Sequence, residues 1–352
     1  MIKNNRRHFL KHLAVLPAAA AMPKTLLSAV FRDASAKERT MEVNRKSYSP
    51  PYIEMQKSGE LKARAEILHE RMRHCDLCPR DCSTDRIAGQ RGDCRAHATL
   101  EISSASAHFG EERELVGRSG SGTVFFTNCS MHCVFCINYE VSQLGHGREY
   151  STDQLAEMMI MLQRRGCHNI NVVSPTHYLP HILFALDRAV TMGLNIPLVY
   201  NTSGWEKKEV LEFLDGIVDI YLTDFKYADP EAADKYSPGA ACYPETARLA
   251  LLEMNRQTKV ANPDPDTGLI YRGLMIRHLV MPENVARSDR VMRWIANNLP
   301  KDTYVNIMSQ YTPMYKAFDY PEIARRLYRS EYNNVVTVAR SAGLTNLRLQ
   351  MQ

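Results

Sequence analysis

The chain has 352 residues, of which 45% are apolar and 24% charged, and its formal net charge is +5. These proportions are ordinary for a globular protein with a sizeable core. The charge is mild, and no dense block of Lys and Arg with interleaved aromatic residues occurs, so we expect no nucleic-acid partner.

The N-terminus has the layout of an export signal. Arg6 and Arg7 lie in a segment, residues 5–11, that matches the twin-arginine pattern closely, and a short apolar run with four consecutive alanines follows. A basic start, a short apolar run and small residues are typical of a targeting segment. The run is too short for a ~20-residue membrane span, so we expect no transmembrane segment. The sequence predicts a twin-arginine-type signal over residues 1–29 and a linker over residues 30–60; the alternative is an ordinary basic start.

Four of the nine cysteines lie close together in residues 61–110, after a short helix expected over residues 59–73. They are Cys75, Cys78, Cys82 and Cys94. The intervening spacings of two, three and eleven residues favour a thiolate–metal site. Four thiolates suit either tetrahedral zinc or a fully ligated 4Fe–4S cluster, and two disulfides are the alternative if the protein is exported. The sequence thus predicts a four-cysteine metal-binding module and leaves its metal open.

From about residue 121 the pattern alternates between strand and helix. The expected strands are Thr123–Phe126, Asn169–Val173, Pro197–Asn201, Asp219–Phe225, Met275–Met281 and Tyr304–Met308. Helices are expected between most of them, the clearest around residues 155–162 with Ser151 and Thr152 as caps. This alternation predicts an α/β fold, a partial (β/α)6 barrel over residues 111–315, with functional residues at the C-terminal ends of the strands. Residues 316–352 are expected to form a C-terminal helical tail.

A second cysteine cluster follows the first of these strands. Cys129, Cys133 and Cys136 are separated by three and two residues. Three thiolates on a 4Fe–4S cluster leave one iron without a protein ligand, and this iron can chelate the amino and carboxylate groups of S-adenosylmethionine. The alternative is a structural zinc site with a fourth ligand such as His132. Cys167 stands alone, as does Cys242, and each is expected to be a small buried apolar residue.

The Cys-x3-Cys-x2-Cys motif, with Phe135 before its last cysteine, strongly resembles the radical S-adenosylmethionine superfamily. The resemblance covers roughly residues 70–315 and is to an uncharacterised branch related to pyruvate formate-lyase activating enzymes. The segments that resemble this branch are Cys136–Glu140, Asn201–Gly204, Asp219–Lys226 and Arg277–Pro282, and the branch shares the Cys75–Cys82 pattern. The resemblance implies a 4Fe–4S cluster on the three cysteines, and reductive cleavage of S-adenosylmethionine to a 5′-deoxyadenosyl radical that abstracts hydrogen from a substrate.

One segment departs from the activating enzymes. After the second strand they usually carry Gly-Gly-Glu, which holds the methionine amino group, whereas this chain has Ser174-Pro175-Thr176-His177. A serine or threonine hydroxyl, or a backbone carbonyl, can accept from an ammonium, so cofactor binding survives the change. The departure weakens the comparison with glycyl-radical activases but not with the superfamily.

Polar residues at the strand ends are the candidates for the cofactor pocket. They are Ser174, Thr176, His177, Asn201, Ser203, Asp224 and Lys226. The alternative for Asp224 and Lys226 is an ordinary ion pair, and that for His177 is a packing or capping role. Asn201 and Ser203 are also residues that favour turns.

The resemblance implies a low-potential electron donor of the flavodoxin or ferredoxin type, and a protein or peptide substrate. Within enzymes, the alternative is action on a small molecule; outside them, it is a non-catalytic iron–sulfur or zinc module for electron transfer. The chemistry favours the cytoplasm, where S-adenosylmethionine and reductants are supplied, whereas the N-terminal signal indicates export. The sequence leaves the compartment open.

Overall fold

The computed structural model describes residues 48–350, within a compact unit that spans Ser49–Gln352. The expected signal over residues 1–29, and most of the expected linker, lie outside the described residues. The helices are α2 (Tyr52–Ser58), α3 (Glu60–Glu70), α4 (Arg113–Val116), α5 (Tyr139–Ser142), α6 (Thr152–Arg164), α7 (Leu179–Thr191), α8 (Lys208–Leu211), α9 (Pro230–Tyr236), α10 (Tyr243–Thr258), α11 (Ser288–Asn298) and α12 (Arg329–Ser341).

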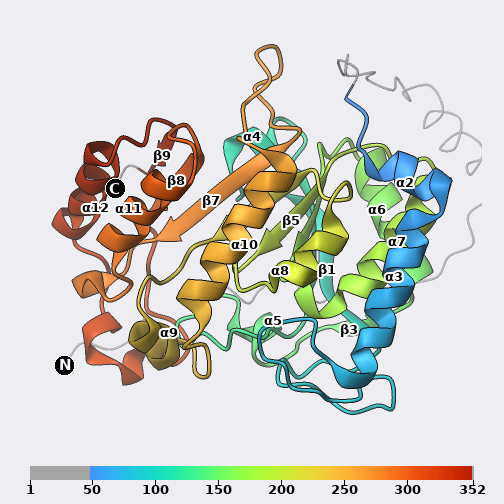
Figure 1. The fold of residues 1–352 in the computed structure, drawn as a ribbon, viewed down its shortest axis with the longest axis horizontal. Coiled ribbons are helices and arrows are strands. Elements are labelled where there is room, and N and C mark those ends of the chain that lie inside the picture. The colour runs from blue at the N-terminus through green and yellow to red at the C-terminus, as the bar shows by residue number, and fades with distance from the viewer. Residues whose placement is uncertain (1–47, 351–352) are drawn as a thin grey trace, which may run out of the picture. The chain divides into compact units, whose positions relative to one another are not determined.

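One sheet of nine strands organises the described residues (Figure 1). Its strands are β1 (Leu100–His108), β2 (Ser121–Phe126), β3 (Arg148–Tyr150), β4 (Ile170–Val173), β5 (Leu198–Thr202), β6 (Ile220–Asp224), β7 (Gly273–Leu279), β8 (Tyr304–Met308) and β9 (Leu347–Leu349). Their order is β3-β1-β2-β4-β5-β6-β7-β8-β9, and the sheet does not close. From β2 to β9 all pairings are parallel, whereas β1 runs antiparallel to β2 and β3. The α/β fold with its six expected parallel strands is confirmed, and it is consistent with a partial barrel.

The two faces of the sheet carry different cores. Side chains alternate along a strand, and on β6 the side chain of Tyr221 joins the large core that the long helices share. Its neighbours Ile220 and Leu222 belong instead to a separate cluster with Leu115 of α4 and residues of β5, β7 and β8. We call the face that carries this smaller cluster the inner face of the sheet. Its apolar residues fill the N-terminal half of the strands.

Towards the C-terminal ends of the strands the inner face becomes polar. Asp224 pairs in register with Arg277, Arg277 with Asn306, and Asn306 with Arg348. Asp224 lies two residues after Leu222, so alternation places it, and the residues level with it, on the inner face. Four polar side chains from four adjacent strands are thereby aligned at one end of the sheet.

Two helices have local sequence causes that are visible in the structure. The Ser151 hydroxyl accepts a hydrogen bond from the Gln154 backbone N–H, and the Gln154 side chain accepts from the Ser151 N–H. This capping box begins α6 where the sequence predicts it. Part of the expected linker is also ordered as α2, because Tyr52 is fully buried and its hydroxyl donates to the Ile196 carbonyl at 2.6 Å.

The segment expected as a helical tail contains α12, which packs against α11, and then adds β9 to the edge of the sheet. Three strands, β1, β3 and β9, were not expected from the sequence. Among the described residues, no helix is both long and apolar enough to cross a membrane.

Candidate metal centre and cofactor pocket

The loop after β2 carries Cys129, Cys133 and Cys136 as free cysteines. Two residues on it have left-handed backbone, Asn128 with φ 68° and His132 with φ 55°. Asparagine and histidine tolerate this conformation better than most residues. The Asn128 side chain also donates to Glu101 Oε2 of β1 at 2.8 Å, which holds the start of the loop. These left-handed residues turn the chain sharply, so that the loop carrying the three cysteines stays at the C-terminal end of β2.

Each of the three sulfurs has a hydrogen-bond partner. The Met131 backbone N–H donates to Cys129 Sγ at 3.5 Å, and the Ser237 hydroxyl donates to Cys133 Sγ at 3.1 Å. Cys136 Sγ lies 3.1 Å from the Ser142 hydroxyl oxygen. Hydrogen bonds to sulfur stabilise thiolates and tune iron–sulfur clusters. The donor set therefore fits a cluster bound by three thiolates.

Burial works against ionisation of these cysteines in the absence of a metal. It raises the pKa of Cys129 to about 12 and also raises that of Cys133. The nearby Lys226 ammonium acts in the opposite direction on both pKa values. Metal binding requires thiolates and drives their deprotonation, so a bound metal and Lys226 together favour the liganding form.

His132 does not complete a zinc site on this loop. Its Nε2 lies 2.8 Å from the Asp93 carbonyl oxygen, and its Nδ1 lies 3.3 Å from Gln143 Oε1. Both ring nitrogens thus have partners that are not sulfur. The geometry favours three thiolates without a histidine ligand.

A buried charged network lies beside the cysteine loop, at the ends of β5, β6 and β7. Asp224 accepts from Lys226 Nζ at 2.6 Å and from Arg277 Nε at 2.9 Å. Arg277 also donates to Asn201 Oδ1 at 2.7 Å and forms an ion pair with Glu111 at 3.4 Å. The structure therefore brings together three of the predicted pocket residues with Arg277 and with Glu111, which sequence reasoning missed.

Electrostatics keep Asp224 and Lys226 ionised, whereas burial raises the pKa of Glu111. Burial by itself would raise the pKa of Asp224, but Arg277 and Lys226 outweigh it and leave the pKa below its usual value. Burial would likewise lower the pKa of Lys226, but Asp224 outweighs it and the pKa is raised. An ammonium has three N–H donors, so Lys226 can bond Asp224 and still donate to a bound carboxylate.

A cavity of about 630 Å³ adjoins the network on the inner face. Arg277, Glu111, Asn306 and Arg348 are among its lining residues. This volume is within the range of small-molecule sites. Charged residues of the network thus line a cavity that is large enough for a small molecule.

Ser174 and Ser203 lie at strand ends with their side chains half-buried. Ser174 has φ 54°, and its N–H donates to the Asn201 carbonyl at 2.9 Å, which joins the ends of β4 and β5. The Ser203 carbonyl accepts from the Tyr243 hydroxyl at 2.8 Å, and that hydroxyl also accepts from the Lys226 N–H. Both serines therefore lie next to the charged network.

Thr176 and His177 are buried, and their hydrogen bonds reach other parts of the protein. The His177 ring donates through Nε2 to the Thr127 carbonyl at 2.7 Å, directly before the cysteine loop. Burial lowers the pKa of His177 to about 3, so the ring is neutral. The Thr176 hydroxyl donates to Glu206 Oε1 at 2.6 Å. Both side chains thus support the strand ends, and their contact with a cofactor stays a prediction.

Glu206 is a fully buried carboxyl that sequence reasoning missed. Burial raises its pKa from 4.5 to about 7, although hydrogen bonds from Thr176, Thr202 and Tyr200 lower it. A raised pKa means that the folded protein binds a proton more tightly than the unfolded chain. Its contribution to stability is therefore full below pH 4.5 and is lost as the pH rises through 7.

Replacing Glu206 with glutamine is expected to remove this pH dependence. At about 1.4 kcal/mol per pKa unit, the wild type loses about 3 kcal/mol between pH 4.5 and 8 relative to the variant. Thermal unfolding of both proteins at fixed metal content across this range measures the difference. The exposed Glu245→Gln serves as the control, and parallel pH profiles for wild type and Glu206→Gln would contradict the assignment.

The upstream cysteines also come together in the structure. All four are free, and three of them, Cys75, Cys78 and Cys94, are buried. The charge of Cys94 acts on the pKa of Cys78, and the charges of Cys75 and Cys82 act on that of Cys94. The set is therefore one cluster of sulfurs.

The two lone cysteines differ in burial. Cys167 is buried as expected, whereas Cys242 is exposed.

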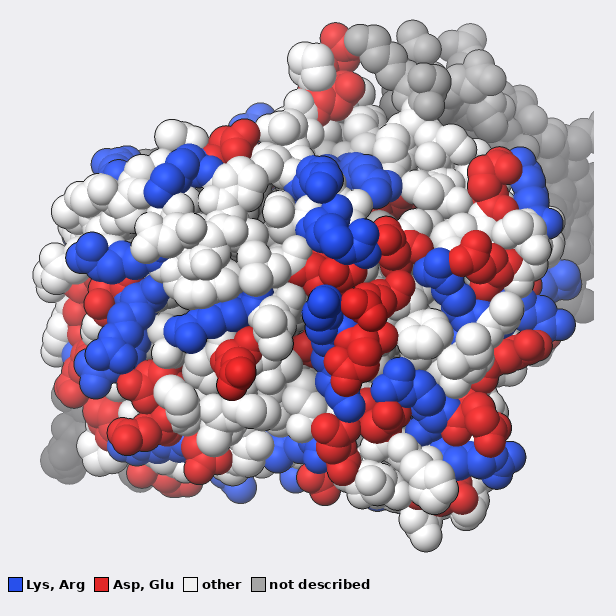
Figure 2. All heavy atoms as spheres, in the orientation of Figure 1, with Lys and Arg blue, Asp and Glu red and all other residues white. Residues whose placement is uncertain are grey.

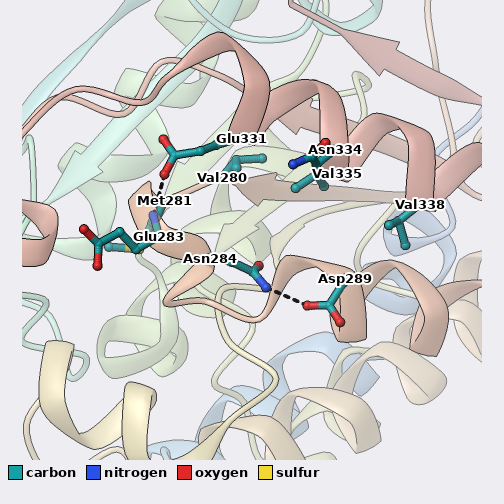
Figure 3. Close-up of a pocket in the computed structure, with 9 residues that line it drawn as sticks. All are labelled: Val280, Met281, Glu283, Asn284, Asp289, Glu331, Asn334, Val335 and Val338. Carbon is teal, nitrogen blue, oxygen red and sulfur yellow. Dashed lines mark hydrogen bonds between the residues drawn. The ribbon is translucent and has the colours of Figure 1, made fainter.

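Two other surface features are separate from these sites. A smaller pocket of about 200 Å³ lies between α11, α12 and the turn Pro282–Asn284, and its lining includes no cysteine and none of the network residues (Figure 3). Its polar groups are paired, Glu331 with the Glu283 N–H and Asn284 with Asp289. On the face shown in Figure 2, positive and negative side chains are interspersed.

Comparisons with known proteins agree with this geometry. The model of the radical SAM superfamily matches residues 123–253, which include the cysteine loop, Asp224 of β6 and Lys226 after it. An uncharacterized protein of the archaeon Methanocaldococcus jannaschii is 32% identical over 302 residues, a region that covers 83% of this chain and 82% of the relative. Membership of this family implies a 4Fe–4S cluster and S-adenosylmethionine as cofactors. The chain belongs to the radical SAM superfamily.

Proposed function

We propose that Cys129, Cys133 and Cys136 bind the 4Fe–4S cluster of a radical SAM enzyme that abstracts hydrogen from a protein or peptide substrate. The observation that carries the cluster assignment is the cysteine loop itself. Three free cysteines lie on one loop at the C-terminal end of β2, and each sulfur has a hydrogen-bond partner. Three thiolates leave one iron open for the amino and carboxylate groups of S-adenosylmethionine.

When bound, the cluster and S-adenosylmethionine would supply the reductive cleavage of the cofactor and the hydrogen abstraction from the substrate. The protein's part is to bind, orient and exclude water. Lys226, whose charge acts on both Cys129 and Cys133, is the residue we assign to the carboxylate of S-adenosylmethionine. Asp224 holds the Lys226 ammonium in place, and Arg277 holds Asp224.

Ser174, Asn201 and Ser203 complete the proposed pocket at the ends of β4 and β5. We assign the Ser174 hydroxyl to accept from the ammonium of S-adenosylmethionine, in the position where activating enzymes usually carry a glutamate. Asn201 uses its amide to connect Arg277 and Glu111, so we assign it to the shape of the pocket. A low-potential donor of the flavodoxin or ferredoxin type supplies the electron.

The class of substrate can be tested with deuterium. A host grown in deuterated medium is lysed, and its macromolecular and small-molecule fractions are each incubated with the reduced protein and S-adenosylmethionine. Deuterium in 5′-deoxyadenosine from the macromolecular fraction alone is the expected result. Label from the small-molecule fraction alone would favour a small-molecule enzyme. No 5′-deoxyadenosine in either fraction would identify a non-catalytic module.

A further inference from the structure

The four upstream cysteines surround a site whose geometry differs from that of zinc. Four thiolates on a tetrahedral zinc, each about 2.3 Å from the metal, lie only about 3.8 Å from one another. Across residues 48–350, only one group of three possible metal ligands has its ligand atoms all within 4.8 Å of one another. This group is His97, Glu101 and Glu149. No three of the four sulfurs are therefore that close. A four-iron cluster binds each thiolate on a different iron, and so needs this wider spacing.

Gly92 approaches two of the sulfurs closely. A Cβ atom there would be 3.3 Å from Cys82 Sγ and 3.5 Å from Cys94 Sγ, and 3.9 Å from Cδ of the Arg86 side chain. A larger residue at this position would press against both sulfurs. The glycine therefore lets the backbone pass beside the cysteine set without a side chain of its own.

A buried arginine indicates that the site is anionic. Arg86 is fully buried, its Nη1 lies 3.8 Å from Cys75 Sγ, and its Nε has no partner among the described residues. A buried cation needs a compensating negative charge. Two disulfides would be neutral, whereas four thiolates around a metal carry net negative charge beside the Arg86 guanidinium.

Backbone donors follow the same pattern here as in the loop after β2. The N–H groups of Arg80, Thr84 and Ala96 bond the sulfurs of Cys78, Cys82 and Cys94, each two residues before its donor. Met131 has the same relation to Cys129. Three upstream sulfurs and one sulfur of the loop after β2 thus accept from the amide two residues further along the chain.

The segments that carry the two cysteine sets are hydrogen-bonded to each other. Arg80, between Cys78 and Cys82, donates from Nε to the Ser130 carbonyl at 2.8 Å. The His132 ring lies 2.8 Å from the carbonyl oxygen of Asp93, the residue before Cys94. Residues adjacent to the ligands of one site therefore bond residues adjacent to the ligands of the other.

From these observations we propose that Cys75, Cys78, Cys82 and Cys94 bind a second, fully ligated 4Fe–4S cluster that relays electrons to the cluster on the loop after β2. The relay part of this proposal rests on the proposed function. One electron enters from a flavodoxin- or ferredoxin-type donor, which is oxidised as the second cluster is reduced. The same electron then passes to the open cluster, and the second cluster returns to its oxidised state.

The experiment is anaerobic reconstitution of the full chain with Fe²⁺ and sulfide in the presence of equimolar Zn²⁺, followed by metal and sulfide analysis. The wild type is expected to hold about eight irons and no stoichiometric zinc. About four irons with one zinc, or about four irons alone, would overturn the second cluster. This count needs no variant, so it decides the question even if substituted proteins fail to fold.

A variant separates this proposal from the proposed function. The triple variant Cys129→Ala, Cys133→Ala, Cys136→Ala is expected to keep about four irons and a reduced-cluster paramagnetic signal that S-adenosylmethionine does not change. Loss of all iron from a folded triple variant would contradict the proposal. If the wild type holds about eight irons but cleaves no S-adenosylmethionine, the proposed function fails and the second cluster stands.

The relay is tested in Cys78→Ala, Cys82→Ala. Reduction of the remaining cluster by a flavodoxin-type donor is expected to be slower than in the wild type, while small chemical reductants still reduce it. An unchanged rate with the protein donor would overturn the relay.

Discussion

Cys133→Ser is expected to abolish reductive cleavage of S-adenosylmethionine. Cys133 is the most buried of the three cysteines on the loop after β2, and Ser237 donates to its sulfur. A serine hydroxyl is a far weaker ligand for iron than a thiolate, so the cluster is lost or loses its open geometry. Removing a residue that hydrogen-bonds a metal ligand lowers activity roughly 10–100-fold. Removing the ligand itself is expected to lower activity further.

The measurement is the rate of 5′-deoxyadenosine formation by the reduced protein under anaerobic conditions. Cys242→Ser is the matched control, because Cys242 is exposed and belongs to neither cysteine set. It is expected to retain the wild-type rate. A Cys133→Ser protein that still cleaves S-adenosylmethionine at the rate of the control would exclude Cys133 as a ligand.

Lys226→Met is expected to weaken binding of S-adenosylmethionine while the iron content stays unchanged. The substitution keeps the length of the side chain and removes its charge. Truncating one partner of a buried, hydrogen-bonded charge pair costs about 2 kcal/mol or more, which corresponds to roughly a 30-fold rise in Kd. The remaining ion pair between Asp224 and Arg277, at 2.9 Å, is expected to keep the strand ends in place.

Equilibrium dialysis of the oxidised protein against S-adenosylmethionine measures this Kd without turnover. Lys235→Met is the control, since Lys235 is about half exposed and pairs with Glu322 at the surface. An unchanged Kd for Lys226→Met would remove Lys226 from the cofactor pocket. A loss of iron in the same variant would instead assign Lys226 to support of the cysteine loop.

The strands that carry the site were predictable because their sequence signal is strong. Buried parallel strands read as short apolar, β-branched runs between helices, and all six expected runs are parallel strands of the sheet. The strands β3 and β9 are only three residues long, and β1 has a register shift between Ile102 and Ser104. Short strands and strands with an irregular register carry little periodicity, so these three were missed.

Some residues of the candidate site can be recognised from their local sequence, whereas others depend on contacts between segments far apart in the chain. Cys129, Cys133 and Cys136 are recognisable from spacing alone, because the ligands lie within eight consecutive residues. Glu111 reaches Arg277 from a segment 166 positions away in the chain, and no motif marks it. Its role depends on the register of β6, β7 and β8 and on how α4 closes the inner face. Contacts of this kind are set by the fold and leave no pattern in the sequence.

His177 lies at a strand end, and its hydrogen bond gives it a structural role beside the cofactor contact that the sequence predicts. The residue follows β4 as expected, but the short turn Thr176–Tyr178 directs its ring towards Thr127. There it is almost fully buried and supports the start of the cysteine loop. Ser174 lies three residues earlier, before this turn begins, and its side chain is half-buried. Which of the two faces the cofactor depends on backbone geometry that composition does not encode.

The loop after β2 is expected to hold a cluster with one iron open to S-adenosylmethionine. Electron paramagnetic resonance of the reduced, anaerobically reconstituted protein, with and without S-adenosylmethionine, tests this expectation. We expect the cofactor to change the cluster signal in the wild type and in Cys78→Ala, Cys82→Ala, which retains the loop. A signal that is identical with and without S-adenosylmethionine in both proteins would contradict it.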